Sequence, residues 1–293
     1  MTDPRDVLVV AEDLTKVFFS PFLRRRVEAL RGVSFTVRKG SVTGFLGANG
    51  AGKTTTMKVL LGLLAPTSGR ASLFGVPVPN RKARERIGFM PESPSFPPNQ
   101  SAREVVAFAA TIQGSKFVGR QTEKALTRSG LEVAAWDRPT ASLSKGQGQR
   151  VGLAAAIVEE PELLILDEPM SGLDPIGRAE VRSLIASEHQ KGCTVLFSTH
   201  VLSDAEDLCT HVCMIDQGRV VVDSPLEALL AGDHRGIRVH YASGPDDLFP
   251  NDEALDDGLL AAVVAGRRVR EVIREKKCLQ DVFTHYASHP VHS

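Results

Sequence analysis

The chain has 293 residues, of which 42% are hydrophobic, and its 35 Lys and Arg residues are balanced by 35 Asp and Glu residues. This content is enough for one large domain or two smaller ones, and the balanced charge gives no general attraction to nucleic acid or anionic lipid. The best candidate for a membrane span, Leu259–Ala265, is far shorter than the roughly 18 residues required. The acidic start of the chain, Met1–Asp6, differs from the basic and then apolar order of a signal peptide. We therefore expect a cytoplasmic protein that is not inserted in a membrane and reaches one only through a partner.

The first motif along the chain is a phosphate-binding loop. Residues 47–54 read Gly-Ala-Asn-Gly-Ala-Gly-Lys-Thr, which is the complete G-x-x-x-x-G-K-[ST] pattern. Ser41–Leu46 is an apolar run typical of a strand, and Thr55–Leu64 has apolar residues at helical spacing, so the loop connects a strand to a helix as the motif requires. Its glycines let backbone N–H groups converge on phosphate oxygens at the positive end of the helix dipole. This context favours a nucleotide over another anion.

Lys53 is expected to act in catalysis by contacting the β- and γ-phosphates, and the Thr54 hydroxyl is expected to coordinate Mg²⁺. The predicted nucleotide-binding residues of the loop are Gly47, Ala48, Asn49, Gly50, Ala51, Gly52, Lys53, Thr54 and Thr55.

The next segment, from about residue 93 to 150, lacks strand alternation and carries helical patterns such as that of Ala102–Ala110. It ends in Leu-Ser144-Lys-Gly-Gln, directly before the helical stretch Gln149–Val158, which places Ser144 at a helix N-terminus. A second phosphate-binding helix end is redundant in one small protein unless it serves a nucleotide held by another copy.

Two carboxylates follow a strand that is too apolar to lie at a surface. Leu163–Leu166 leads directly into Asp167 and Glu168, as in a buried parallel strand whose carboxyl end faces a ligand. We expect Asp167 to hold Mg²⁺ through water, because a buried carboxylate needs a partner and Mg·ATP supplies a cation. We expect Glu168 to be the base for the attacking water, because hydrolysis needs a base positioned near the γ-phosphate. A structural ion pair is the alternative. His200 follows the strand Cys193–Ser198, and a lone His in such a place is usually structural.

The four cysteines, at positions 193, 209, 213 and 278, have no C-x-x-C spacing. His211 and Cys213 could share a face of a strand, but Cys209 belongs to the end of the preceding helical pattern, so a zinc site is not favoured. We expect buried thiols, as in a reducing compartment.

The ordered series of motifs resembles that of the ATP-binding-cassette (ABC) ATPases over about residues 7–230. The signature of that family is L-S-G-G-Q, and this chain has Lys145 at the third position. In the family the signature closes over ATP held by the opposite subunit in a head-to-tail dimer, which implies nucleotide contacts for Ser144, Gly146 and Gln147. Ser171–Asp174 looks like the dimer-contact loop of the family.

The resemblance implies three further site residues. His200 is similar to the switch histidine of the family, which donates to the γ-phosphate and polarises the attacking water. Phe18 matches the aromatic residue that stacks on adenine, while the adjacent Phe19 would point the other way in a strand. Glu92 lies in the loop that leads into the helical segment from about 93 to 150, which we call the lid-joining loop, at a position where the family usually carries Gln. A carboxylate can still ligand Mg²⁺ or water, but it adds negative charge beside the γ-phosphate.

The implied fold class is α/β, with a P-loop NTPase core in which a mixed sheet lies between helices and the N-terminal β part is antiparallel. A helical subdomain is inserted at about 93–150, so that the ATPase domain spans 1–231. Residues 232–293 are expected to form a small α+β extension, in which Gly236–Tyr241 alternates like a strand. Cys278–Phe283 is similar to the end of ABC-2 ATPase subunits.

Glu92 and Lys145 are most familiar among the ATPases of ABC-2-type exporters. The sequence therefore predicts an ATPase that binds ATP and Mg²⁺, pairs with a second copy of itself and powers export through a separate membrane permease, at the cytosolic face of the membrane. The resemblance places a permease helix beside the lid-joining loop, where Phe96 and Phe108 are expected to be exposed.

The alternative function is that of a soluble ABC ATPase acting on nucleic acid or ribosomes. Such proteins usually carry coiled-coil inserts or two cassettes, and this chain shows neither. A regulatory module without turnover is disfavoured because Glu168 and His200 are both present.

Overall fold

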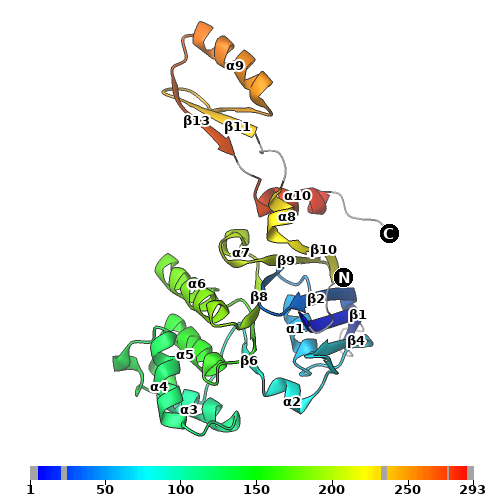
Figure 1. Cartoon of the computed structure of the whole chain (residues 1–293), viewed down its shortest axis with the longest axis vertical. Helices are drawn as coiled ribbons and strands as arrows, with labels where there is room; N and C mark the ends of the chain where they lie inside the picture. Colours follow the sequence, from blue (N-terminus) through cyan, green and yellow to red (C-terminus); the bar gives the residue numbers. More distant parts are fainter. Residues whose placement is uncertain (1–5, 21–24, 232–235, 276, 289–293) are drawn as a thin grey trace. The chain divides into compact units, whose positions relative to one another are not determined.

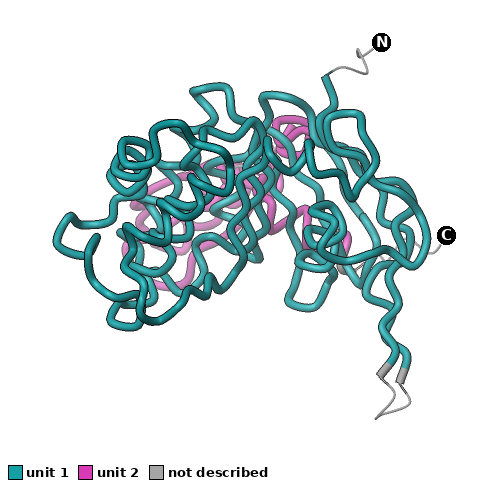
Figure 2. The backbone as a smooth tube through the Cα atoms, turned by 90° about the horizontal axis from the view of Figure 1, so that it is seen from below, with its two compact units in different colours: residues 1–224 teal, residues 225–293 magenta. Residues whose placement is uncertain are grey.

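The computed structural model describes residues 6–20, 25–231, 236–275 and 277–288. The chain divides into two compact units, Met1–Ser224 and Pro225–Ser293 (Figure 2). The domain boundary that the sequence places at residue 231 stays a prediction.

The first unit contains two sheets (Figure 1). One is a four-stranded antiparallel sheet with the order β2-β1-β4-β5, and the other is a six-stranded sheet with the order β10-β9-β3-β8-β7-β6. The strands are β1 Val7–Ser20, β2 Arg25–Arg38, β3 Val42–Leu46, β4 Ser68–Leu73, β5 Val76–Pro77, β6 Ile87–Met90, β7 Leu163–Leu166, β8 Thr194–Thr199, β9 His211–Asp216 and β10 Arg219–Pro225. The mixed architecture with an antiparallel N-terminal part is confirmed.

Three neighbouring parallel strands position the loops that carry the predicted chemistry. β3, β7 and β8 are buried along their whole length, and β8 pairs with both of the others. The register sets Leu46 opposite Thr199 and Leu166 opposite Phe197. Because parallel strands end at the same edge of a sheet, the segments that follow these three strands meet there.

Helix α1, Lys53–Leu60, packs its apolar side into a core that both sheets share. Val9 and Phe35 contribute to that core from the antiparallel sheet, and Phe45 and Leu196 contribute from the parallel one. The remaining helices of this part are α2 Arg81–Arg84, α6 Pro175–Gln190 and α7 Leu202–Leu208. Since the core holds α1 from both sides, the phosphate loop in front of it has a rigid support.

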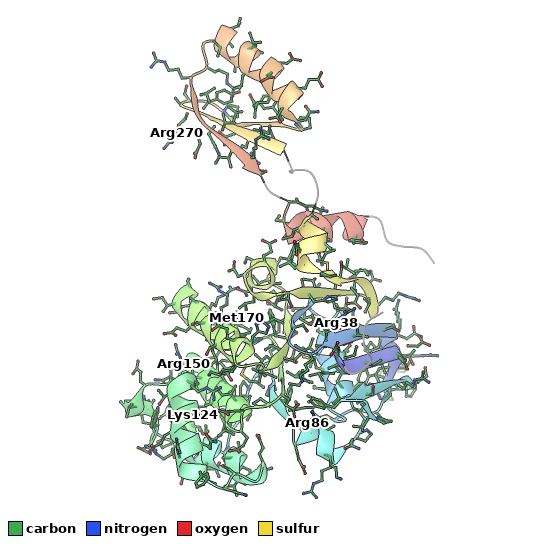
Figure 3. The ribbon with its side chains drawn as sticks, viewed as in Figure 1. Arg38, Arg86, Lys124, Arg150, Met170 and Arg270 are labelled. Carbon is green, nitrogen blue, oxygen red and sulfur yellow. The ribbon has the colours of Figure 1, made fainter. Side chains whose placement is uncertain are left out.

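A helical lobe is formed by α3 Ala102–Ile112, α4 Val118–Arg128 and α5 Lys145–Ile157, which gather in the green part of the ribbon (Figure 1). Arg150, labelled on α5 in Figure 3, pairs with Glu180 of α6 and donates to the carbonyl of Gly130 at 2.8 Å. Arg128 at the end of α4 pairs with Glu188 of α6. These two ion pairs join the lobe to one face of α6.

The second unit is a small α+β fold, as predicted. Its three-stranded sheet has the order β12-β11-β13, and its core contains Val239, Tyr241 and Ala262. The elements are α8 Leu226–Leu230, β11 Gly236–Tyr241, β12 Asp247–Phe249, α9 Asp252–Val264, β13 Val269–Glu275 and α10 Leu279–Ser288. In the part of the chain that the structure describes, no helix is both long and apolar enough to cross a membrane.

Three of the four cysteines are buried, as predicted, whereas Cys278 is half-buried. Burial raises the pKa of the Cys193 thiol to about 12. Burial also raises the pKa of Cys209 and of Cys213 above the ordinary value for a thiol. These thiols are therefore protonated and unreactive at neutral pH.

Candidate nucleotide-binding site

The phosphate loop has the backbone conformation that its sequence predicts. Gly50 and Gly52 have φ angles of 82° and 114°, in the left-handed region that favours glycine. A side-chain carbon added to Gly47 would lie 2.3 Å from the carbonyl oxygen of Ile215, so this glycine is required by close packing. Gly52 is the N-cap of α1 and has no side chain to cap it, which leaves the first N–H groups of the helix available to an anion.

The Lys53 ammonium group lies inside this loop. It donates to the carbonyl oxygens of Gly47 at 2.7 Å and Ala48 at 3.2 Å. It also lies 3.2 Å from Glu168 Oε1, and both side chains are buried. Lys53 therefore lies within the phosphate loop, where two carbonyl oxygens and one carboxylate oxygen surround its charge.

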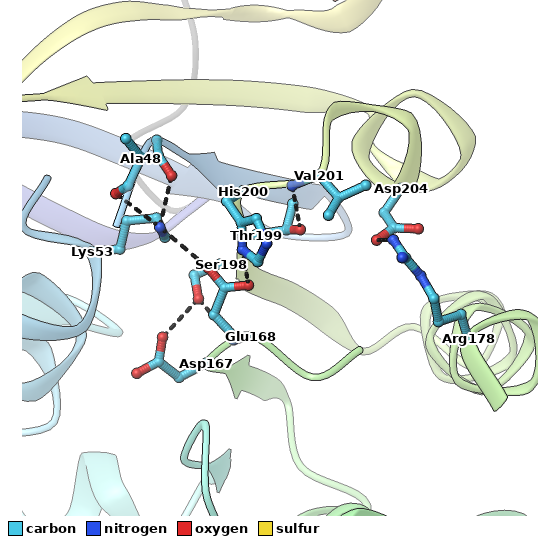
Figure 4. A network of polar contacts seen from close by, with 11 residues as sticks. Ala48, Lys53, Asp167, Glu168, Arg178, Ser198, Thr199, His200, Val201 and Asp204 are labelled. Atoms are coloured by element: carbon cyan, nitrogen blue, oxygen red, sulfur yellow. Dashed lines mark hydrogen bonds and ion pairs between the residues drawn. The ribbon is translucent and has the colours of Figure 1, made fainter. Parts of the chain in front are cut away.

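Glu168 is the centre of a polar network at the ends of β7 and β8 (Figure 4). Its Oε2 lies 2.9 Å from His200 Nδ1, and its Oε1 is buried with no hydrogen-bond partner apart from the ion-pair contact to Lys53. Its backbone has a φ of 47°, a conformation that costs a residue other than glycine about 1–3 kcal/mol. The neighbouring Asp167 is 2% exposed and accepts a hydrogen bond from Ser198 Oγ at 2.7 Å. A buried carboxylate such as that of Glu168, with a strained backbone and one oxygen that accepts no hydrogen bond, is typical of a functional site.

A cavity of about 230 Å³ opens in front of the phosphate loop. Loop residues, the first turn of α1 and two carboxylates meet in it. The lining residues are Ala29, Asn49, Gly50, Gly52, Lys53, Thr54, Thr55, Glu92 and Glu168. The Thr54 hydroxyl and the Glu92 carboxylate in this lining are oxygen ligands of the type that Mg²⁺ prefers, whereas Asp167, the third predicted ligand, is not among the lining residues.

Glu92 is tied through its backbone to the helix that follows the signature. Gln149, which is 1% exposed, donates from Nε2 to the Glu92 carbonyl oxygen at 3.1 Å. A side-chain carbon on Gly152 of the same helix would lie 2.8 Å from Pro94. The lid-joining loop and α5 are thus packed as one body, with the exposed Glu92 carboxylate on the cavity side.

The signature residues cap α5. Ser144 Oγ accepts from the Gln147 amide at 3.2 Å, and Gln147 Oε1 accepts from the Ser144 amide at 3.0 Å, which completes a capping box. A side-chain carbon on Gly146 would meet Leu173 at 3.4 Å, so the helix start lies against the predicted dimer-contact loop. None of Ser144, Gly146 and Gln147 lines the cavity at the phosphate loop of the same chain, among the residues that the structure describes.

Three aromatic predictions have mixed outcomes. Phe18 lies on β1, is 41% exposed and has the Lys16 amine 5.3 Å from its ring centre, but it does not line the cavity, whereas Ala29 on the adjacent strand does. Phe108 is exposed as predicted. Phe96 was also expected to be exposed, but it is half-buried, because it lines a groove of about 440 Å³ between the lid-joining loop and the start of α5.

Sequence reasoning singled out neither Ser198 nor Gln149 as site residues. The signal for Ser198 was its place at the end of a buried strand that runs beside the one bearing the two carboxylates. Gln149 carried no signal in the sequence, because its contact spans 57 residues of chain.

The fold and the loop define this protein as a P-loop nucleotide-binding protein with an inserted helical lobe. Comparison of the sequence and the fold with known proteins identifies the family within this class. The sequence profile of the ABC transporter family matches residues 30–171. Among solved structures, a dimeric ATP-binding cassette bound to ADP and phosphate, in a post-hydrolysis state, is similar with a TM-score of 0.69 at 22% identity, over 75% of this chain and 99% of that one. This likeness shows the fold.

Two proteins with similar sequences show the family of this chain. The chain is 39% identical over 234 residues to the Nod factor export ATP-binding protein I of Burkholderia lata, which covers 76% of this chain and 74% of that protein. It is also 39% identical over 229 residues to the bacitracin transport ATP-binding protein BcrA of Bacillus licheniformis, covering 76% of this chain and 71% of that one. The chain belongs to the ABC transporter family and is one of its ATP-binding, ATP-hydrolysing subunits.

Proposed function

We propose that this subunit uses Glu168 as the base of ATP hydrolysis and, as a dimer, powers export through a separate membrane permease. The observation that carries the proposal is the position of Glu168, whose Oε1 contacts Lys53 and whose Oε2 contacts His200 (Figure 4). A base near the γ-phosphate must be held against a fixed partner and must be close to the group that binds the phosphate. Glu168 meets both conditions.

Each remaining site residue has a role in this proposal. Lys53 exchanges its contact with the Glu168 carboxylate for the β- and γ-phosphates, and His200 donates to the γ-phosphate. Thr54, Asp167 and Glu92 would hold Mg²⁺, directly or through water, and the cation would neutralise charge on the phosphate oxygens. Phe18 is the proposed contact for adenine.

A head-to-tail dimer accounts for the position of the signature. The start of α5 offers N–H groups and a polar cap, yet it lies away from the cavity of its own chain. In the proposed dimer, Ser144, Gly146 and Gln147 contact ATP bound by the other copy. The dimeric assembly of the similar cassette supports this arrangement.

Export through a permease is supported by the relatives, whose names describe Nod factor export and bacitracin transport. The groove between the lid-joining loop and α5, lined by Pro94, Phe96, Pro98 and Leu143, is the proposed docking site for a cytosolic helix of the permease. Through that contact the subunit would sit at the cytosolic face of the membrane. The transported substrate is not specified by these residues, because their chemistry concerns ATP alone.

The first experiment compares Glu168→Gln with the wild type. The variant is expected to lose about 100-fold in kcat while it still binds ATP, because the amide keeps the shape of the carboxylate but accepts no proton. Glu162→Gln is the matched control, since it changes an exposed carboxylate before β7 that pairs with Arg86. Hydrolysis by Glu168→Gln at the wild-type rate would move the role of base to another residue.

The second experiment tests the partner. The tagged subunit is purified from cells that express a candidate membrane protein with about six apolar spans, and hydrolysis is measured with that protein in vesicles. Co-purification and a changed rate support transport. Stimulation by RNA or ribosomes, with no binding to the membrane protein, would favour the alternative function.

A further inference from the structure

A buried hydroxyl connects the two carboxylate-bearing residues of the site. Ser198 is fully buried near the end of β8, which runs beside β7 in parallel. Its Oγ lies 2.7 Å from Asp167 Oδ1 and 2.8 Å from the backbone nitrogen of Glu168 (Figure 4). One hydroxyl therefore contacts both the side chain of Asp167 and the backbone of the next residue, Glu168.

The chemistry of these groups fixes the direction of both hydrogen bonds. A carboxylate only accepts, so the single proton of Ser198 is donated to Asp167. The Glu168 N–H then donates to a lone pair of the same oxygen. Hydrogen bonds in such a chain polarise and strengthen one another, and the chain orients the Asp167 carboxylate relative to the strained backbone of Glu168.

Burial makes this hydroxyl difficult to replace. Ser198 has no exposed surface, so bulk water does not reach its hydroxyl, while Asp167 is 2% exposed and Glu168, at the cavity, is 7% exposed. If the hydroxyl is removed, a buried N–H and a buried carboxylate oxygen both lose a partner.

We propose that Ser198 is a positioning residue for ATP hydrolysis, which holds Asp167 toward the cation and Glu168 toward the attacking water in one fixed mutual geometry. This inference rests on the proposed roles of Asp167 and Glu168. Ser198 itself is not among the residues that line the cavity at the phosphate loop. Its contribution is the orientation of Asp167 and Glu168.

The test uses Ser198→Ala in the full chain. Its kcat is expected to fall about 10-fold, while the affinity for ATP measured without Mg²⁺ stays within about twofold. The second measurement is made in the Glu168→Gln background, where hydrolysis is expected to be about 100-fold slower. There, Ser198→Ala is expected to raise about fivefold the Mg²⁺ concentration that gives half of the cation-dependent increase in ATP binding. This second readout reports on Asp167 alone. Ser198→Thr, which keeps the hydroxyl, is expected to restore both values.

Thr194→Val is the matched control. Thr194 begins the same strand, is fully buried, and its hydroxyl accepts from the Gly40 amide at 2.9 Å, so this variant also removes a buried acceptor. It is expected to lower the melting temperature as much as Ser198→Ala does and to leave kcat and the Mg²⁺ dependence unchanged. If Ser198→Ala does not fold, Ser198→Cys gives the same test, because a thiol of similar size is a weak donor.

Equal kcat and equal Mg²⁺ dependence in Ser198→Ala and Thr194→Val would overturn the proposal and leave Ser198 a structural residue. That outcome is distinct from a failure of the proposed function. If Glu168 is not the base, Glu168→Gln itself hydrolyses ATP, and the Ser198 proposal falls with it. If only the Ser198 proposal fails, Glu168→Gln remains inactive while Ser198→Ala turns over at the wild-type rate.

Discussion

Replacing Glu168 by Gln is expected to raise the affinity of the chain for ADP, although the residue is not expected to touch ADP. The Lys53 ammonium group is held by two carbonyl oxygens and by Glu168 Oε1 at 3.2 Å. Lys53 must leave the carboxylate in order to reach a β-phosphate. The variant removes that competing charge and leaves both carbonyl contacts in place.

The size of the effect follows from the geometry. At 3.2 Å, two unit charges in an effective dielectric of about 20 attract by about 5 kcal/mol before solvation is counted. Net contributions of hydrogen bonds to charged groups are about 1.5–3 kcal/mol. The Gln amide oxygen keeps part of this attraction as a dipole, so a change of about 1.4 kcal/mol, or about 10-fold in the dissociation constant, is expected.

The assay is equilibrium titration of ADP by fluorescence or calorimetry. ADP has no γ-phosphate, so its affinity is free of repulsion between that group and Glu168. His200→Ala is the control, because His200 contacts Oε2 of Glu168, whereas Lys53 contacts Oε1. Its ADP affinity is expected to stay within about twofold of the wild type. An unchanged ADP affinity in Glu168→Gln, or an equal increase in both variants, would refute the argument.

Three further predictions concern the phosphate loop, the signature and the groove. Lys53→Ala should weaken ATP binding about 30-fold or more in the same titration, by removing the charge on the phosphates, and an unchanged affinity would contradict the reading of the loop. In the Glu168→Gln background, light scattering should show a dimer with ATP and a monomer with ADP. Ser144→Arg should abolish the dimer while the subunit stays folded, with a melting temperature lowered only by the loss of the α5 cap, and a persisting ATP-dependent dimer would count against contact in trans. Phe96→Ala should reduce co-purification with the permease about 10-fold or more while ATP hydrolysis in solution persists, whereas Phe117→Ala, which removes an exposed aromatic outside the groove, should have no effect. Equal recovery of both variants would place docking elsewhere.

The parts of the site that depend on neighbouring residues in the sequence were predictable. The strand, loop and helix around residues 47–54 follow from a local pattern, and Gly50 and Gly52 have the positive φ angles that the loop requires. The position of Ser144 at a helix start follows from the polar residues before the apolar run, and the structure adds the capping box with Gln147. Local chemistry decides these features, so the sequence contains them.

The parts of the site that depend on tertiary packing were not predictable. Glu168 has a φ of 47°, and its amide donates to the Ser198 hydroxyl, which lies 30 residues away in the sequence. The resting contacts of Lys53 depend on how β7 and β3 are aligned through β8. Phe96 was expected to be exposed, but its environment is set by residues near 140–149 that pack beside it. A single sequence without these pairings cannot fix such positions.

The connection of Glu92 to α5 gives the signature and the nucleotide cavity a common support. Gln149 binds the Glu92 backbone and lies five residues after Ser144 on the same helix, a distance of about 7.5 Å at the rise of an α-helix. A short, close-packed helical segment transmits a displacement with little loss, because protein interiors are poorly compressible. A shift of the Glu92 loop on binding nucleotide must therefore move the start of α5. In the proposed head-to-tail dimer that helix start contacts ATP held by the other copy, so each site is mechanically linked to the nucleotide of its partner.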